Sequence, residues 1–405
     1  MVKPQAIRFS RNEKILLALM AGVNFNHIVD FMIMMPLGPM FIRLFGIEAG
    51  QFGLLVSSYS FTAGLSGLAA SFFIDRFDRK SALLFFFAGF IVSTMACAMA
   101  PGFYFLLAAR SLAGAFGGVL SSLVLSIVSD AIAYERRGTA MGVVMGSFSM
   151  ASVLGVPFSL ELANRFSWHA PFVFLGGLSS LVWLLIMFNM LPMRSHLMSK
   201  ESRHSKWQTI SHIAGNPPQL WALFFLFALV MSQFTVIPYL SQSYVANAGL
   251  PESKLSYIYL FGGMCSMAAA PLVGWIADKT SKHVVFSAAV LFTALPIYFI
   301  TNLGNGQPIW LLILISCTFF IGMSGRMVPA MAMVSSTATP AYRGSFMSVS
   351  SAVQNMSAAV ASFTGGLIVT FEAGKFVHFE KVGYLATAFS LIALYASRRI
   401  PRGQI

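Results

Sequence analysis

Long apolar segments alternate with short polar ones along the whole chain of 405 residues. A helix needs roughly 20 apolar residues to cross a bilayer, and about twelve segments approach or exceed that length. They lie near residues 15–42, 51–74, 81–100, 103–128, 138–163, 170–191, 219–242, 254–277, 284–302, 308–334, 344–370 and 381–397. The pattern predicts an all-α integral membrane protein with twelve transmembrane helices.

The composition supports this interpretation. Hydrophobic residues make up 57% of the chain and charged residues only 10%, whereas soluble domains are about 25% charged. The net charge is +13, but the basic residues form short runs between apolar segments, which indicates contacts with lipid headgroups rather than nucleic acid. The three cysteines lie within predicted spans without metal-ligand spacing, so we expect no metal site and no cofactor.

The distribution of Lys and Arg predicts the orientation. If the N-terminus is cytoplasmic, 19 basic residues fall on the cytoplasmic side and five on the other. Positive residues concentrate on the cytoplasmic side of membrane proteins, so we expect both termini to be cytoplasmic and the protein to lie in the inner (cytoplasmic) membrane of the cell. The first span is too long and too polar at its centre for a cleaved signal sequence.

The chain divides into two related halves. A basic, polar stretch at 194–218 separates six spans from six, which predicts an N-terminal bundle at 1–193, a cytoplasmic linker, and a C-terminal bundle at 219–405. Matching positions lie 203 residues apart: Asp75 and Asp278, Arg76 and Lys279, Arg79 and Lys282, and Gly46 and Gly249. Such repeats predict two pseudo-symmetric bundles with a site between them near the midplane.

Asp30 lies near the middle of the first apolar segment. A carboxylate at that depth is costly and should face the bundle interior. His27, three residues earlier, shares its helical face. The pair predicts a proton or substrate site, in which Asp30 carries the proton and His27 tunes or relays it. The alternative is a structural Asp that ties two helices together.

The loop after the second segment carries a recognisable motif. Residues 71–83 resemble the motif G-x-L-A-D-R-x-G-R-K-x-x-L of the major facilitator superfamily, with Ser71 and Asp78 in place of its two glycines. The matching residues are Asp75, Arg76, Arg79, Lys80 and Leu83. The resemblance implies a conformational latch between the halves on the cytoplasmic side, made by these charged residues with Asp278, Lys279 and Lys282. Ordinary positive-inside charges are the alternative, although they do not explain the repeated Asp.

Two further spans resemble helices of this superfamily. Arg110 and Gly114 in the fourth span match its R-x-x-x-G pattern, and the resemblance implies close packing at Gly114. Gly146, Gly155 and Pro157 in the fifth span resemble the glycine- and proline-rich motif of the drug:proton antiporter branch, in the form found in sugar- and drug-efflux permeases. An ordinary kinked, closely packed helix is the alternative.

In this superfamily the first, fourth, seventh and tenth spans line the substrate cavity. The resemblance therefore implies a cavity lined by residues of those four spans, namely Asp30, His27, Asn26, Arg110, Gln233, Tyr239 and Arg326. A buried Arg326 needs a carboxylate, a backbone carbonyl or an anionic substrate. Alternatively, its side chain extends along the helix to the membrane surface.

No phosphate-binding loop G-x-x-x-x-G-K-[ST] and no G-x-S-x-G motif occurs in the sequence, so we expect neither an ATP-driven pump nor an enzyme. We expect a monomeric, proton-coupled transporter that exports small amphipathic organic molecules by alternating access. Two alternatives remain: an importer of an organic anion or metabolite on the same fold, and a sensor or lipid-handling membrane protein that transports nothing.

Overall fold

The computed structural model describes residues 9–70, 72–133, 136–194, 212–339, 343–372 and 374–401. The side chains of Asp75 and Arg343 are outside this description, as is most of the linker predicted at 194–218. In the first half the main helices are α1 (Arg11–Ile33), α2 (Gly38–Phe45), α3 (Ala49–Ala70), α4 (Arg79–Ala98), α5 (Phe103–Ala131), α6 (Arg137–Met150), α7 (Val156–Arg165) and α8 (Ala170–Asn189).

The second half contains α11 (Pro217–Phe234), α12 (Leu240–Ala246), α13 (Leu255–Lys279), α14 (Lys282–Thr301), α15 (Ile309–Thr337), α16 (Arg343–Ile368) and α17 (Phe379–Ser397). Between α16 and α17, strands β1 (Thr370–Glu372) and β2 (Lys375–Val377) form an antiparallel hairpin in which Phe371 pairs with Phe376. Ten helical segments of the described chain are long and apolar enough to cross a membrane. The two other long helices, the Ser-rich α16 and α17 with its charged first turn, are not among these ten.

Local sequence explains where several helices begin and break. Ser10 caps α1 and exchanges hydrogen bonds with Glu13, as a capping box does. Pro36 and Pro39 follow α1, which ends at Ile33 before a turn leads into α2. A turn of π-helix at Ala151–Gly155 links α6 to α7, just before Pro157. A proline removes a backbone donor and disrupts the helix before it.

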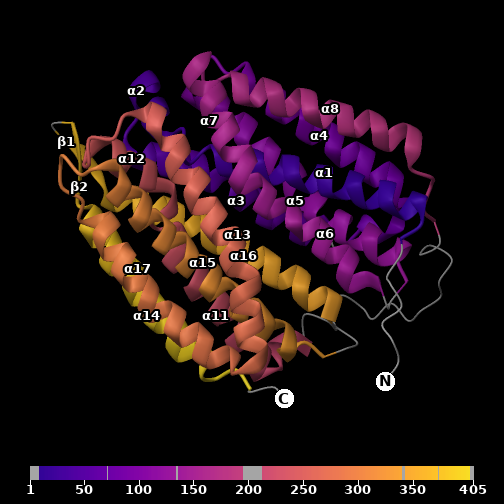
Figure 1. Cartoon of the computed structure of the whole chain (residues 1–405). Coiled ribbons are helices and arrows are strands. Elements are labelled where there is room, and N and C mark those ends of the chain that lie inside the picture. The colour runs from indigo at the N-terminus through magenta and orange to yellow at the C-terminus, as the bar shows by residue number, and fades with distance from the viewer. Residues whose placement is uncertain are drawn as a thin grey trace.

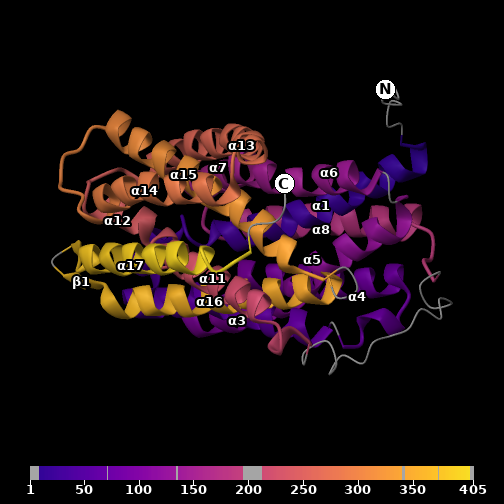
Figure 2. The same cartoon turned by 90° about the horizontal axis from the view of Figure 1, so that it is seen from below.

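The helices of the two halves lie side by side (Figure 1), with the first half in indigo to magenta and the second in salmon to yellow. α3 packs against α16, and α13 packs against α7 and the π-helical turn. The strands, α2 and α12 gather at one end of the molecule, which we call the hairpin end, whereas α1 begins at the opposite end (Figures 1 and 2).

The buried apolar residues show where the halves are joined. One cluster draws from both halves and includes Phe41, Phe52, Trp168, Tyr239 and Phe376, around the hairpin end. A second cluster consists of first-half residues such as Phe87 and Leu123, and a third of second-half residues such as Phe225 and Phe286. The shared core therefore holds the two halves together at the hairpin end.

Candidate functional site

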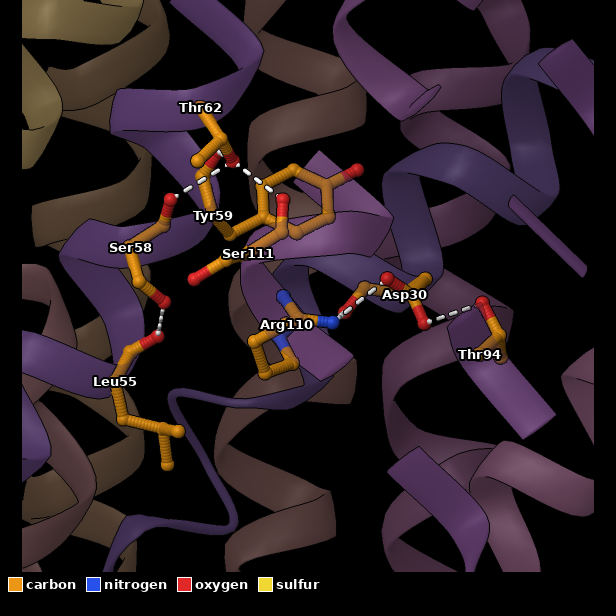
Figure 3. Close-up of polar contacts among 8 residues, drawn as sticks. All are labelled: Asp30, Leu55, Ser58, Tyr59, Thr62, Thr94, Arg110 and Ser111. Atoms are coloured by element: carbon orange, nitrogen blue, oxygen red, sulfur yellow. Dashed lines mark hydrogen bonds and ion pairs between the residues drawn. The ribbon is translucent and has the colours of Figure 1, made fainter. Parts of the chain in front are cut away.

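Asp30 forms a buried ion pair with Arg110. The Asp30 side chain on α1 is fully buried, and Arg110 Nη1 on α5 lies 2.7 Å from Asp30 Oδ2 and 3.2 Å from its backbone carbonyl oxygen. Figure 3 shows the guanidinium pointing at the carboxylate. A buried charge needs a partner of this kind because it has lost the solvation of water.

A third helix completes the contacts of the carboxylate. Thr94 on α4 donates its hydroxyl to Asp30 Oδ1 over 3.2 Å, on the side opposite Arg110. Asp30 therefore connects α1 to both α4 and α5. The carboxylate faces the protein interior rather than lipid. Asp30 does not line the cavity that opens at the hairpin end of the molecule.

The guanidinium of Arg110 also contacts an aromatic side chain. Arg110 Cζ lies 4.4 Å from the centroid of the Tyr59 ring, which is within the range of a cation–π contact. The His27 ring lies 6.1 Å from the rings of both Tyr59 and Phe90. Asn26, on the same helix, donates to the Gly22 carbonyl over 2.8 Å.

Several polar atoms in this cluster are buried without a hydrogen-bond partner among the described residues. They are His27 Nδ1, the Tyr59 hydroxyl, Arg110 Nε and Asn26 Oδ1. Buried polar atoms are rarely left unpaired, so each of these four atoms could still form a further hydrogen bond. Tyr59 was not expected from the sequence, since a lone Tyr in an apolar helix gives no indication of its contacts.

Arg326 on α15 of the second half has different partners from Arg110. It is fully buried, and its Nη1 donates to the Ser232 and Ser390 hydroxyls over 2.9 and 3.0 Å. Its Nη2 lies 2.9 Å from the Met323 sulfur. Among the described residues no carboxylate lies within ion-pair distance of Arg326.

Gln233 and Tyr239, expected to line the cavity, lie in different surroundings. Gln233 on α11 is buried and its Nε2 has no partner among the described atoms. Tyr239 is fully buried and donates its hydroxyl to the Ser362 carbonyl of α16. Its ring and hydroxyl fit against Gly53 of α3 and Gly366 of α16, where an added Cβ would collide with the hydroxyl. Tyr239 therefore lies in the contact between the halves.

A cavity of about 780 Å³ opens at the hairpin end. Both halves form its walls, with Ile42, Arg43 and Ile47 from the first and Gln242, Val245 and Leu367 from the second. Both Nη atoms of Arg43 donate to the carboxylate of Glu252, a bridge between the halves at the cavity rim. This pair could not be predicted from the sequence, because the two residues are 209 positions apart and isolated charges near helix ends are common.

The loop motif lies at the opposite end of the molecule. Arg79 Nε donates to Asp130 over 3.0 Å and Lys80 Nζ to the Met187 carbonyl over 2.8 Å, both within the first half. Asp78, which replaces a motif glycine, caps α4 by accepting from the Ser81 N–H, and it also accepts from the Met193 N–H. Its carboxylate thus anchors the loop.

The other motif residues are placed as follows. Arg76 and Asp278 are exposed, and Lys282 is half-buried. Lys279 Nζ lies 3.9 Å from the Trp275 ring centroid. The side chain of Asp75 is outside the described part of the structure.

Three of the predicted packing residues differ in their surroundings. A Cβ at Gly114 would collide with the Tyr59 carbonyl and Thr62 on α3, and one at Gly155 would collide with Val29 on α1. Gly146 faces open space, with nothing within 4 Å of such an atom. Gly114 and Gly155 therefore allow close helix contacts, and Pro157 follows the π-helical turn.

The described residues contain no group of three or more His, Cys, Asp or Glu side chains that could hold a metal ion.

Comparisons with known proteins agree with this architecture. The sequence profile described as the Major Facilitator Superfamily matches residues 19–362 and, in a second match, 230–403. A "probable sugar efflux transporter" of Helicobacter pylori (strain P12) is 26% identical over 365 residues, 88% of each chain. The "uncharacterized MFS-type transporter YceJ" of Bacillus subtilis (strain 168) is 24% identical over 343 residues, 84% of this chain and 85% of that one.

Solved structures share the fold. The crystal structure of a D-xylose–proton symporter superposes with a TM-score of 0.78 at 16% identity, covering 96% of this chain and 98% of that one. A bacterial homologue of the human lysosomal transporter Spinster, in an inward-facing and occupied conformation, has a TM-score of 0.77 at 14% identity and covers 96% and 97%. The chain belongs to the Major Facilitator Superfamily and is a multi-pass membrane transporter, not an enzyme.

Proposed function

We propose that this transporter exports small amphipathic organic molecules in exchange for protons. The buried Asp30–Arg110 ion pair is the observation that carries the proposal. Protonation of Asp30 removes the charge that attracts Arg110, which weakens the connection between α1 and α5. A neutral carboxyl is also far less costly than a bare charge in the membrane interior. Binding of a proton and binding of substrate can therefore favour different arrangements of these helices.

The substrate class and direction are part of the same proposal. Relatives 26% identical to this chain carry the name "probable sugar efflux transporter", and a neighbour of the same fold is called a D-xylose–proton symporter. His27 would tune or relay the proton. Asn26, Gln233, Tyr239 and Arg326 would contact substrate in states in which the halves have moved apart near the midplane.

The proposed architecture has twelve transmembrane helices in two pseudo-symmetric bundles, 1–193 and 219–405, joined by a cytoplasmic linker at 194–218. Both termini would be cytoplasmic, in a monomer in the inner membrane. The loop residues Asp75, Arg76, Arg79 and Lys80, with Asp278, Lys279 and Lys282, would latch the halves when the opposite end opens. Ion pairs at exposed positions such as Arg76 and Asp278 contribute only ~0–1 kcal/mol each, which suits a contact broken in every cycle.

One observation favours the alternative, an importer of an organic anion. Arg326 is buried with two hydroxyls and a sulfur as its observed partners, and a substrate carboxylate would supply the missing negative charge. In that mechanism the anion binds Arg326 as the halves open. It is released when the halves return to the observed arrangement, in which Arg326 bonds the Ser232 and Ser390 hydroxyls.

Transport into inside-out membrane vesicles tests the proposal. With the lumen acidified, an exporter accumulates radiolabelled D-xylose or tetraphenylphosphonium, and Asp30→Asn should abolish the dependence on the proton gradient. Glu161→Gln, which alters an exposed acid paired with Arg165 on α7, is the matched control and should behave as wild type. Unchanged gradient dependence in Asp30→Asn would remove Asp30 from this role. Uptake of organic acids in right-side-out vesicles that is lost in Arg326→Leu would favour the importer.

A further inference from the structure

The cavity at the hairpin end lies between the two halves. One wall comes from α2 and the residues that follow it, and the other from α12 and the end of α16. Its volume of about 780 Å³ falls within the range of 300–1,000 Å³ typical of small-molecule sites. It lies on different helices from Asp30, Arg110 and Arg326, and none of these three residues lines it.

Gln242 places an unsatisfied amide in the wall of this cavity. The side chain is 2% exposed, and neither Oε1 nor Nε2 has a hydrogen-bond partner among the described residues. It lies against Gly38 of the first half, at which any Cβ would collide with the amide. A buried amide without partners is costly, so a group that both donates and accepts would be held strongly here.

The charges around the cavity indicate a neutral ligand. Arg43 and Glu252 neutralise each other at the rim through two hydrogen bonds. The remaining acid of the lining, Glu48, is exposed to solvent, so the described lining offers an anion no unpaired cation. Apolar walls from Ile42, Ile47, Val245 and Leu367 surround the neutral amide. We propose that the hairpin-end cavity is a second ligand site for a neutral amphipathic molecule that presents a carboxamide or a pair of adjacent hydroxyls to Gln242.

Because both halves form the walls, the site exists in this form only while the hairpin end is closed. A ligand that binds one conformation shifts the equilibrium toward it. Occupancy therefore holds the hairpin end shut and slows transport. The inference extends beyond the proposed function, because it requires neither proton coupling nor a particular transported substrate.

Binding to the full-length protein in lipid nanodiscs tests the site without any gradient. Saturation-transfer NMR would titrate cyclohexanecarboxamide against cyclohexanecarboxylate, which has the same shape but carries a charge. We expect the amide to bind at least about tenfold more tightly, and Gln242→Leu to weaken it about tenfold. Gln219→Leu, which changes a buried amide on α11 outside this cavity, is the matched control and should leave the affinity unchanged.

Ala246→Trp provides an independent test, because Ala246 lines the cavity and lies four residues after Gln242 on the same face of α12, so that an indole would occupy the space beside the amide. We expect this variant to abolish binding of the amide, even if Gln242→Leu does not fold. Three outcomes would overturn the site: equal affinity for amide and carboxylate, binding retained in folded Ala246→Trp, or binding lost in Gln219→Leu and retained in Gln242→Leu. Gradient-driven transport by the wild type would still support the proposed function in each case.

Discussion

Arg110 Nη1 lies 2.7 Å from Asp30 Oδ2, and 1% or less of either side chain is exposed. The two residues are 80 positions apart and join α1 to α5. Breaking a buried ion pair from one side leaves an uncompensated charge, whereas removing both charges can cost little. The pair therefore affects stability as well as the proposed proton coupling.

We expect Arg110→Leu to lower the free energy of unfolding by roughly 3–5 kcal/mol, because it strands the Asp30 carboxylate. The double variant Asp30→Leu with Arg110→Leu should recover most of that loss. Thermal unfolding of the purified protein in detergent would measure both. As a control, Arg165→Leu, which breaks the exposed pair with Glu161, should change stability by at most about 1 kcal/mol. A double variant no more stable than Arg110→Leu would contradict this prediction.

Arg326→Leu should destabilise the protein less than Arg110→Leu does. Removal of the Arg326 guanidinium leaves no carboxylate among the described residues without its partner. The Ser232 and Ser390 hydroxyls, 2.7 Å apart, can still bond each other. The same thermal measurement compares the two variants. If Arg326→Leu proved as damaging as Arg110→Leu, an acidic partner would have to lie outside the described chain.

Gly114→Ala should destabilise the protein by about 1–3 kcal/mol, because its methyl group would overlap the Tyr59 carbonyl and the Thr62 hydroxyl and push α3 from α5. Gly146→Ala is the matched control. It places the same methyl group in open space and should be neutral or slightly stabilising, since Ala favours helices over Gly by ~1 kcal/mol. Equal losses in the two variants would show that packing at Gly114 is not the cause.

The Arg43–Glu252 bridge predicts that the halves separate at the hairpin end during transport. In a background in which Cys97, Cys265 and Cys317 are replaced by Ala, cysteines at both positions, joined by a short bis-maleimide, should abolish transport in proteoliposomes. Each single-cysteine variant treated with the same reagent should remain active, because an exposed ion pair contributes little by itself. Transport that continued in fully cross-linked protein would mean that this end stays closed throughout the cycle.

Much of the helical framework could be predicted from apolar segment length. The expected span at 284–302 corresponds to α14, Lys282–Thr301, and that at 170–191 to α8, Ala170–Asn189. The internal repeat also located matching turns, because Gly46 and Gly249 both adopt positive φ angles, +60° and +75°, which favour glycine. The hairpin at 370–377 was missed since the apolar segment before it continues into β1.

The site was only partly predictable. The depth of Asp30 and Arg110 in apolar segments indicated buried charges, but their contact depends on how α1 and α5 pack. Whether Asp30 carries a proton stays a prediction. In this structure Tyr239 lies between α3 and α16, because Gly53 and Gly366 leave room for its hydroxyl, and its expected role in lining a cavity stays a prediction. The sequence predicts which helix carries a side chain, but the packing of the neighbouring helices determines what that side chain contacts.

The apolar cluster shared by both halves at the hairpin end has a thermodynamic consequence. If the hairpin end opens, water reaches Phe41, Phe52, Tyr239 and their neighbours. Exposure of this apolar surface would raise the heat capacity of the protein. The enthalpy of that step then varies with temperature, so an Arrhenius plot of turnover limited by it would be curved. Cooling weakens the hydrophobic attraction and would make this end easier to part.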